Sequence, residues 1–469
     1  MRSEFNKLFK NFFTFFVGDF GTRILSFLMV PYYTNVLSTA QYGEIDLVNS
    51  TVNLILPLIT LNLSDAVFRY VMDKTSNKKE ILGNGLVFSF LGVLLFSTVL
   101  LITNGAGSDY ALYMYLITVV SIIYGLFINY LKAIGKLKLV AISGFINTFL
   151  FIIFNIYFLT NLKLGVTGYF LSTILSSVTI CVFLFFSQRL WREVDINIAR
   201  HDKGLIKKMI RYALPLIPTN LGWWIIMLSN RFIINEMLGV EFTGIYSVAN
   251  KVPTILQALL TIFMQAWQIS ATSLFEDNKQ KMQHHFEVML KYYKSGIFIF
   301  SSILICFTQV IMKIIAQNDF YQGWVCVPFL LLAISFSSIN GLITAIYTSF
   351  KENNAQFYTV VAGAIINIIL NVVLIKFLGL IGSTIASAIS YAIIMYSRLM
   401  DTERLLKFNR EYNKINLNFF VLIIQAIIFI YLDNLIVKYC MQIICFITII
   451  YLNRNTIKQL GTFAKRRVS

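Results

Sequence analysis

The chain has 469 residues, of which 57% are hydrophobic and 13% are charged, and its mean hydropathy is +0.73. A water-soluble globule of this length does not carry so apolar a composition, so the sequence predicts an all-α, polytopic membrane protein. The formal net charge of +17 also raises the alternative of a nucleic-acid partner, and the distribution of the basic residues decides against it.

Apolar runs of roughly the 20 residues needed to cross a bilayer recur from residue 11 almost to the C-terminus. The first run is too long and too polar for the apolar region of a signal peptide, so we keep it in the mature protein. Short polar breaks define about 14 candidate transmembrane segments, the last of them short. Their expected cores are 12–34, 45–72, 81–103, 110–131, 139–159, 165–187, 212–238, 244–274, 292–316, 323–350, 355–378, 380–400, 417–437 and 440–453.

Lysine and arginine gather in alternate connections between these segments. With the N-terminus placed in the cytoplasm, the inner connections hold most of them, including the basic residues from Arg398, at the end of the 380–400 segment, to Lys414. This asymmetry is the positive-inside rule, and it predicts that both termini are cytoplasmic. The net charge therefore follows from topology and implies no nucleic-acid partner. The basic residues expected in outer connections are Lys163, Lys313, Lys376 and Lys438.

Two stretches of the chain repeat each other at an offset of 201 residues. LSTAQYGEIDLVN (37–49) lies over LGVEFTGIYSVAN (238–250), and a second echo joins GVTG (165–168) to GLIG (379–382). The same order in both halves predicts a duplicated six-helix unit, and because six is even the copies are parallel repeats. We therefore expect an N-terminal six-helix bundle, a C-terminal six-helix bundle, and two extra helices with a basic cytoplasmic tail, over 1–200, 201–410 and 411–469.

Three motifs carry a resemblance to a known family. SNRFIINEMLGVEFTGIYSVANKV (229–252) resembles the seventh-to-eighth helix hairpin of the polysaccharide (O-antigen and capsule, Wzx-type) flippases of the multidrug/oligosaccharidyl-lipid/polysaccharide (MOP) exporter superfamily. YYTNVLSTAQYGEIDLV (32–48) and INIILNVVLIKFLGLIGSTIAS (366–387) are similar to that family too. One position departs from it: Asn230 precedes Arg231 where many members carry Asp, so an ion pair at this step is lost.

The resemblance implies two six-helix bundles around a central cavity, lined chiefly by helices 1, 2, 7 and 8, that opens alternately to each side. It also implies a cargo: an undecaprenyl-diphosphate-linked oligosaccharide flipped from the inner to the outer leaflet of a bacterial inner membrane for lipopolysaccharide O-antigen or capsule biosynthesis. Membrane lipid is one partner, and a polysaccharide polymerase and a chain-length regulator are candidate partners.

Four basic residues lie inside the segments that the resemblance places around the cavity. They cost about 2.5–3.5 kcal/mol each in lipid, so we expect them to face protein or water. Arginine offers a fixed fork to phosphate oxygens and lysine a point charge, so such cations could replace the water around a diphosphate. We therefore predict a cationic, substrate-binding lumen formed by Arg23, Arg69, Arg231 and Lys251.

The two carboxylates of these segments leave the roles of two arginines open. Asp19 and Arg23 are spaced i, i+4, as are Asp65 and Arg69, so each arginine has a local partner for an ion pair. Asp19 carries a further hypothesis, the uptake of a proton or Na⁺ for coupling. No other cofactor is expected.

Aromatic and amide side chains on the same segments could contact sugars. An indole face stacks on a sugar ring, which suggests Trp223 and Trp224, and side-chain amides bond hydroxyls, which suggests Asn53, Asn220 and Gln257. For each of them, packing or hydrogen bonding between helices is the alternative interpretation.

The sequence lacks G-x-x-x-x-G-K-[ST], G-x-S-x-G and H-E-x-x-H, so ATP hydrolysis within this chain is not expected. A membrane-bound glycosyltransferase or polymerase that acts on the same lipid usually displays a sizeable soluble loop, and no expected outer loop is long enough, so we do not expect an enzyme. No metal site is expected either, because the adjacent His284 and His285 are interpreted as part of a solvated inner loop. A cation-coupled multidrug exporter and a lipid II flippase of the same superfamily stay open as alternative functions.

Overall fold

The computed structural model describes residues 21–73, 77–102, 109–195, 203–214, 216–261, 264, 279–350, 353–405 and 412–459. All regular elements in these ranges are helices. Ten of them are long and apolar enough to cross a membrane, or eleven if the bent pair Thr39–Ile59 and Leu63–Val71 forms one span. The expected all-α, multi-pass architecture is thereby confirmed. The total of about 14 spans stays a prediction, since the first, seventh and eighth expected segments extend beyond the described residues.

The chain forms two compact units, Met1–Leu228 and Ser229–Ser469. The boundary falls inside one helix, α10 (Leu216–Leu238), which contributes its first half to unit 1 and its second half to unit 2. The expected division of the chain at residues 200 and 410 concerns the repeated bundles and stays a prediction.

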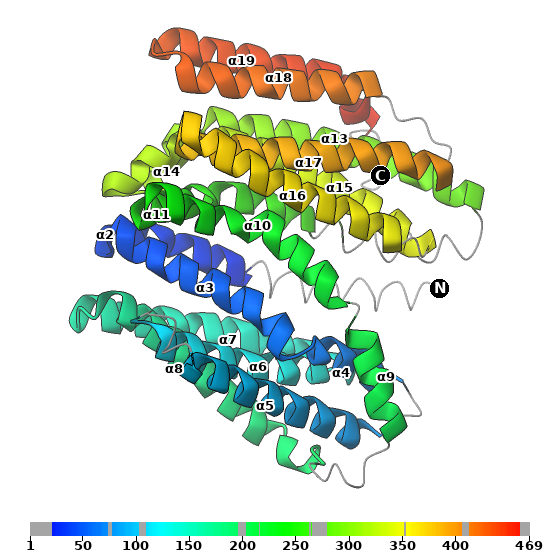
Figure 1. Ribbon diagram of the computed structural model, residues 1–469. Helices are drawn as coiled ribbons and strands as arrows, with labels where there is room; N and C mark the ends of the chain where they lie inside the picture. The colour runs from blue at the N-terminus through cyan, green and yellow to red at the C-terminus, as the bar shows by residue number, and fades with distance from the viewer. Residues whose placement is uncertain are drawn as a thin grey trace, which may run out of the picture. The chain divides into compact units, whose positions relative to one another are not determined.

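Unit 1 is a bundle of helices with a core between α4, α5, α6 and α8, and α9 lies across one end of that core (Figure 1). Small residues bring its helices together, because a Cβ at Gly85 would lie 2.6 Å from Cγ2 of Val67 and one at Gly92 would overlap the carbonyl oxygen of Ile59. After the helical residues 21–28, its elements are α2 Val30–Val36, α3 Thr39–Ile59, α4 Leu63–Val71, α5 Lys78–Ile102, α6 Ala111–Ala133, α7 Leu137–Asn155, the π-helical turn Ile156–Asn161, α8 Gly165–Ser187, the 3₁₀ turn Leu190–Arg192 and α9 Lys203–Ala213.

In unit 2, α15 and α16 pack against α17. The C-terminal hairpin, formed by α18 and α19, packs along α13. Two layers of buried polar contacts hold this hairpin: Asn453 donates to Asn418 Oδ1 (2.8 Å), and Ser302 donates to Gln425 Oε1 (2.8 Å). Such side chains are satisfied by one another where no water is present. Its elements are α11 Val240–Ala249, α13 Lys279–Cys306, α14 Thr308–Ile315, the 3₁₀ segment Asn318–Cys326, α15 Val327–Phe350, α16 Asn353–Leu378, α17 Leu380–Leu405, α18 Tyr412–Tyr431 and α19 Leu435–Leu452.

The sequence repeat has a structural counterpart in the backbone. Ser38 is the N-cap of α3, where it forms a capping box with Gln41, and Gly239, at the same offset, is the N-cap of α11. Gly165 and Gly379 both adopt left-handed backbone, with φ of 57° and 60°, at the start of α8 and of α17. Glycine adopts this conformation without strain, which explains why both copies carry it there.

Three expectations about basic and histidine residues are wrong. Lys438 lies inside α19 and is 6% exposed, because Asn434 caps that helix earlier than expected and Trp324 and Phe429 receive the ammonium over their rings at 5.5 and 5.6 Å. Arg398, expected in an inner loop, is fully buried in α17. The stretch with His284 and His285 is helical, because α13 begins at Lys279.

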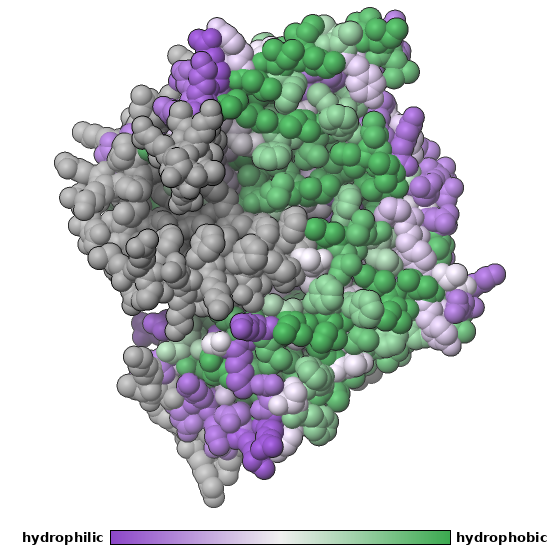
Figure 2. Space-filling view, turned by 180° about the vertical axis from the view of Figure 1, so that it is seen from behind, coloured by the Kyte–Doolittle hydropathy of each residue, from purple (hydrophilic) through white to green (hydrophobic). Residues whose placement is uncertain are grey.

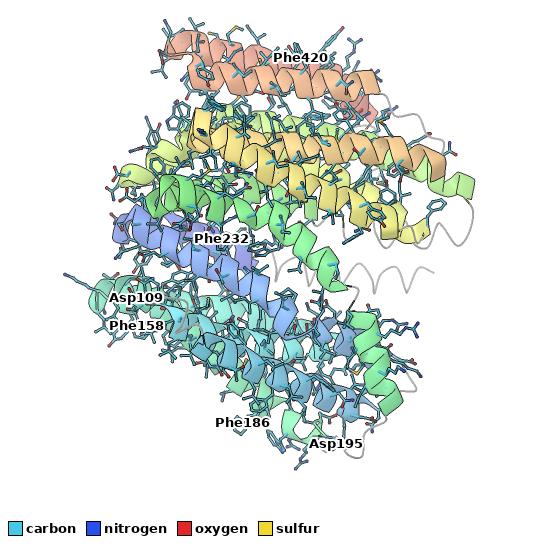
Figure 3. All side chains as sticks on the ribbon, in the orientation of Figure 1. Asp109, Phe158, Phe186, Asp195, Phe232 and Phe420 are labelled. Atoms are coloured by element: carbon cyan, nitrogen blue, oxygen red, sulfur yellow. The ribbon has the colours of Figure 1, made fainter. Side chains whose placement is uncertain are left out.

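The surface of the described residues agrees with a lipid environment. Figure 2 shows a broad field of hydrophobic residues on one face, with hydrophilic residues gathered along its margins. Phe186 and Phe420 are 62% and 58% exposed and extend outward from α8 and α18, as Figure 3 shows. In unit 1, Asp109 and Asp195 lie toward opposite ends of the helices. Exposed phenylalanine on the helices and charged residues toward their ends are typical of membrane-spanning bundles.

Candidate functional site

The second expected segment is broken between α3 and α4. The two helices meet at a bend of 58°, and Leu61 and Asn62 between them adopt left-handed backbone, with φ of 48° and 54°. Asparagine tolerates this conformation, whereas for leucine it costs about 1–2 kcal/mol. A strained residue in the middle of a broken span indicates a site that the surrounding structure maintains.

Proline and threonine make the end of α3 polar. Pro57 has no backbone N–H, so the carbonyl oxygen of Asn53 one turn earlier loses its helical donor. The backbone N–H and the hydroxyl of Thr60 both donate to the carbonyl oxygen of Leu56, at 3.0 and 2.8 Å. The break therefore places polar backbone and side-chain atoms inside an otherwise apolar segment, where Thr60 and Asn62 are buried.

A pocket of 470 Å³ lies beside this break, within unit 1. Its volume is within the range of about 300–1,000 Å³ that is typical of small-molecule sites. None of its lining residues is charged, so the pocket suits a neutral polar group. The residues that line this α3–α4 pocket are Asn53, Leu56, Pro57, Thr60, Asn62, Ser64, Ser121, Ile122, Gly125, Trp224, Met227 and Leu228.

Trp224 is the aromatic wall of the α3–α4 pocket. Its indole Nε1 donates to the carbonyl oxygen of Ser50 in α3 at 2.9 Å, which fixes the plane of the ring, and its side chain is half-buried. Asn53 is the second predicted sugar contact that lines this pocket. It lies about one turn after Ser50 in α3, and it is exposed. The structure therefore brings Asn53 and Trp224 together at one site.

The charged residues predicted in unit 1 lie outside the lining of this pocket. Arg23, Arg69 and Asp65 are exposed, the first on the helix 21–28 and the other two on α4. Asp65 and Arg69, both described, do not form the expected ion pair; the carboxylate of Asp65 interacts electrostatically with Lys132 of α6 instead. Asp19 lies outside the described residues, so its pairing with Arg23 and its coupling role stay predictions.

Arg231, in unit 2, is 7% exposed and stacks on an aromatic ring. Its guanidinium carbon lies 5.8 Å from the ring centroid of Tyr246 in α11, and its carbonyl oxygen accepts a hydrogen bond from Thr243 at 3.3 Å. A cation over a ring face gains electrostatic energy and keeps a fixed orientation. α10 and α11 thus hold this arginine in a defined position.

Asn230, the residue that departs from the family pattern, is the centre of a buried amide cluster. Its Nδ2 donates to Tyr246 Oη at 3.0 Å and to Ser387 Oγ at 2.6 Å, and its Oδ1 accepts from Asn371 Nδ2 at 3.0 Å. Asn371 also donates to Asn367 Oδ1 at 3.1 Å. The cluster is uncharged and joins α10, α11, α16 and α17.

The remaining predicted residues are Lys251, Gln257, Asn220 and Trp223, and none of them lines the α3–α4 pocket among the described residues. Lys251 and Gln257 are half-buried in the helical stretch 251–261 of unit 2, and the hydroxyl of Thr254 donates to the carbonyl oxygen of Lys251 at 2.6 Å. The side chains of Asn220 and Trp223 are outside the described part of the chain. A single lumen shared by the four predicted cations, two in each unit, stays a prediction.

Sequence reasoning missed several members of both sites. Asn367 and Asn371 are spaced i, i+4 within the apolar run INIILN, a signal that could have indicated a polar helix face. Ser121 and Gly125 show the same spacing in α6 and face the α3–α4 pocket. Small and amide residues in apolar runs are common helix-packing signals, so their spacing alone does not reveal a pocket.

Comparison with known proteins finds one matching family and several solved structures of similar fold. A family profile described as "Polysaccharide biosynthesis protein" matches residues 8–268. An inward-facing multidrug resistance MATE family transporter of the MOP superfamily superposes with a TM-score of 0.67 at 14% identity, covering 82% of this chain and 95% of that one. The lipid II flippase MurJ, in an inward closed conformation, gives 0.62 at 14% identity, covering 94% and 99%. These likenesses confirm the fold.

A sequence relative is also found among the archaea. An uncharacterized membrane protein of Methanocaldococcus jannaschii is 25% identical over 189 residues, which is 39% of this chain. The match spans 42% of the length of that relative. This relative is described as a membrane protein, and its description names no activity.

Proposed function

The chain belongs to the polysaccharide biosynthesis protein family, and from this premise we propose that it flips a lipid-linked oligosaccharide across the membrane. The cargo is an undecaprenyl-diphosphate-linked repeat unit for O-antigen or capsule, and it moves from the inner to the outer leaflet of a bacterial inner membrane. Both termini lie in the cytoplasm. The process is transport by alternating access and involves no covalent step.

The α3–α4 pocket is the observation that carries this proposal. Its uncharged polar lining and the fixed indole of Trp224 suit a sugar, which presents hydroxyls at its edge and C–H groups on its face. The free carbonyl of Asn53 and its side-chain amide offer an acceptor and donors to hydroxyl groups. The pocket takes a saccharide unit, and the diphosphate binds the predicted cations.

The two alternatives inside the superfamily differ in how they fit these features. A multidrug exporter of organic cations needs carboxylates at its site, and no carboxylate lines the α3–α4 pocket among the described residues. A lipid II flippase is the nearer alternative, because a sugar-accepting pocket suits its cargo as well. Assays with both lipid-linked cargoes separate these two functions.

Filling the pocket tests the proposal without disturbing the helices. Gly125 lines the pocket, and a Cβ added there meets no atom within 4 Å, so Gly125→Leu fits the fold and occupies the cavity. We expect surface glycan to fall about tenfold or more, while lipid-linked oligosaccharide accumulates in the inner leaflet. A tenfold decrease corresponds to a loss of about 1.4 kcal/mol in the free energy of cargo binding. Surface glycan and extracted lipid-linked oligosaccharide are measured in cells that depend on this protein.

Gly144→Leu is the matched control, since a Cβ at Gly144 in α7 also meets nothing within 4 Å and the residue is not part of the pocket. Normal export by Gly125→Leu at normal protein level would contradict a role for the pocket.

A further inference from the structure

Helix α9 (Lys203–Ala213) differs from the other helices of unit 1 in length and direction. With 11 residues it reaches only about 16 Å, too short to cross a bilayer. In Figure 1 it runs across the direction of α5 to α8, at the end of unit 1 where α4 also lies. A short helix that crosses the ends of membrane spans lies in the interface between lipid and water.

One face of α9 is anchored in the core of unit 1. Met209 and Ala213 are 1% and 0% exposed and belong to the hydrophobic core, and Leu205 and Ile210 pack against it. The spacing of these residues is that of one helix face. The apolar face is therefore occupied by the protein itself and is not available to another partner.

The opposite face of α9 presents three cations to the outside. Lys207, Lys208 and Arg211 are all exposed, and Tyr212 and Leu214 beside them are 39% and 45% exposed. Basic side chains flanked by an aromatic and an aliphatic residue match the headgroup region, where the charges meet phosphate and the apolar groups reach the acyl boundary. Lys207, Lys208 and Arg211 belong to a stretch that the positive-inside rule assigns to the cytoplasmic side, so α9 is expected at the inner leaflet.

α9 is also attached to the helix that follows the break. Tyr70 of α4 donates its hydroxyl to the carbonyl oxygen of Lys208 at 3.2 Å, and its ring meets that of Tyr212 edge to face at 6.1 Å. α4 carries Ser64 of the α3–α4 pocket. A ligand that binds the basic face of α9 is therefore linked to the α3–α4 pocket by the contacts between α9 and α4.

From these observations we propose that the face formed by Lys207, Lys208 and Arg211 binds the headgroups of anionic phospholipids. The occupant follows from charge complementarity, since a zwitterionic headgroup offers no net charge to three neighbouring cations. Each basic residue near an anionic membrane surface strengthens binding about fivefold, so the three together contribute about 100-fold. The bound headgroups hold α9, and with it α4, at the interface.

The test compares lipid binding by the full-length protein and two triple variants in detergent. Native mass spectrometry follows the titration of phosphatidylglycerol and of phosphatidylcholine. In the variant Lys207→Gln, Lys208→Gln, Arg211→Gln the apparent affinity for phosphatidylglycerol is expected to fall about 100-fold. The matched control replaces three exposed lysines elsewhere by Gln and is expected to bind like wild type: Lys163, Lys313 and Lys376.

Two results would overturn the proposal. One is an unchanged affinity of the α9 variant for phosphatidylglycerol, and the other is equal binding of phosphatidylcholine by wild type. Because the replaced side chains are exposed, both variants should fold, and circular dichroism checks this. The variant Lys207→Arg, Lys208→Arg keeps the charges and should retain binding. Inorganic phosphate at the same concentration should not displace the lipid.

Discussion

Replacing Arg231 and Lys251 together with glutamine is expected to reduce the export of surface glycan by about 1,000-fold, which is below detection in most assays. A hydrogen bond to a charged group contributes about 1.5–3 kcal/mol, which corresponds to about 10- to 150-fold for each cation that contacts a diphosphate. Glutamine keeps most of the side-chain volume, so the change removes charge with little effect on packing. The measurement is surface glycan per cell at equal protein level.

Two controls separate a role in transport from a role in folding. Arg454 in unit 2 also lies over an aromatic ring, with its guanidinium carbon 4.4 Å from the ring centroid of Tyr451. It is exposed and belongs to no predicted cargo site, so Arg454→Gln controls for the loss of a cation–π contact at the surface. Arg231→Lys keeps the charge and should retain part of the activity. Full export by the double variant would show that these cations do not bind the cargo.

Arg398→Ala is expected to produce the largest loss of stability. The guanidinium is fully buried and donates to Thr359 Oγ1, to Thr344 Oγ1 and to the carbonyl oxygen of Gln356, at 2.9, 2.8 and 3.3 Å. It lies over the ring of Tyr347, so this side chain connects α15, α16 and α17. Alanine removes these bonds and leaves a cavity, at a combined cost of about 3–5 kcal/mol. For a chain of 469 residues the thermal midpoint should fall by about 3–5 °C.

Thermal unfolding in detergent, followed by the loss of the monodisperse peak in size-exclusion chromatography, measures this change. Lys376→Ala in α16 removes an exposed cation from the same unit and should leave the midpoint within about 1 °C. A midpoint for Arg398→Ala that equals that of wild type would mean that the buried arginine stabilises nothing.

Much of the fold could be predicted because membrane helices have strong local signals. Apolar runs of sufficient length predicted the spans of α5 to α8 and of α15 to α19. The sequence repeat aligned Ser38 with Gly239, and both residues are N-caps of helices. In both cases the physical cause acts within a few residues along the chain. Periodicity and capping are therefore sufficient to find them.

The features that sequence reasoning missed depend on contacts between distant residues. Pro57 lies inside α3, but the pocket beside it is formed together with residues of α6 and α10, which are far away along the chain. Arg398 was expected in a loop because basic residues usually leave the bilayer; its hydrogen-bond partners lie 39 to 54 positions away. Single positions do not reveal such partners.

The most direct test of the account is a flipping assay in proteoliposomes that contain only this protein. Undecaprenyl-diphosphate-linked oligosaccharide with a fluorescent label is compared with the same oligosaccharide on a neutral polyprenyl carrier, and quenching by dithionite reports the leaflet of the label. We predict that the diphosphate-linked cargo crosses at least tenfold faster than in protein-free vesicles and that the neutral cargo does not. Equal rates for both cargoes, or no acceleration of the diphosphate-linked one, would contradict the proposed function.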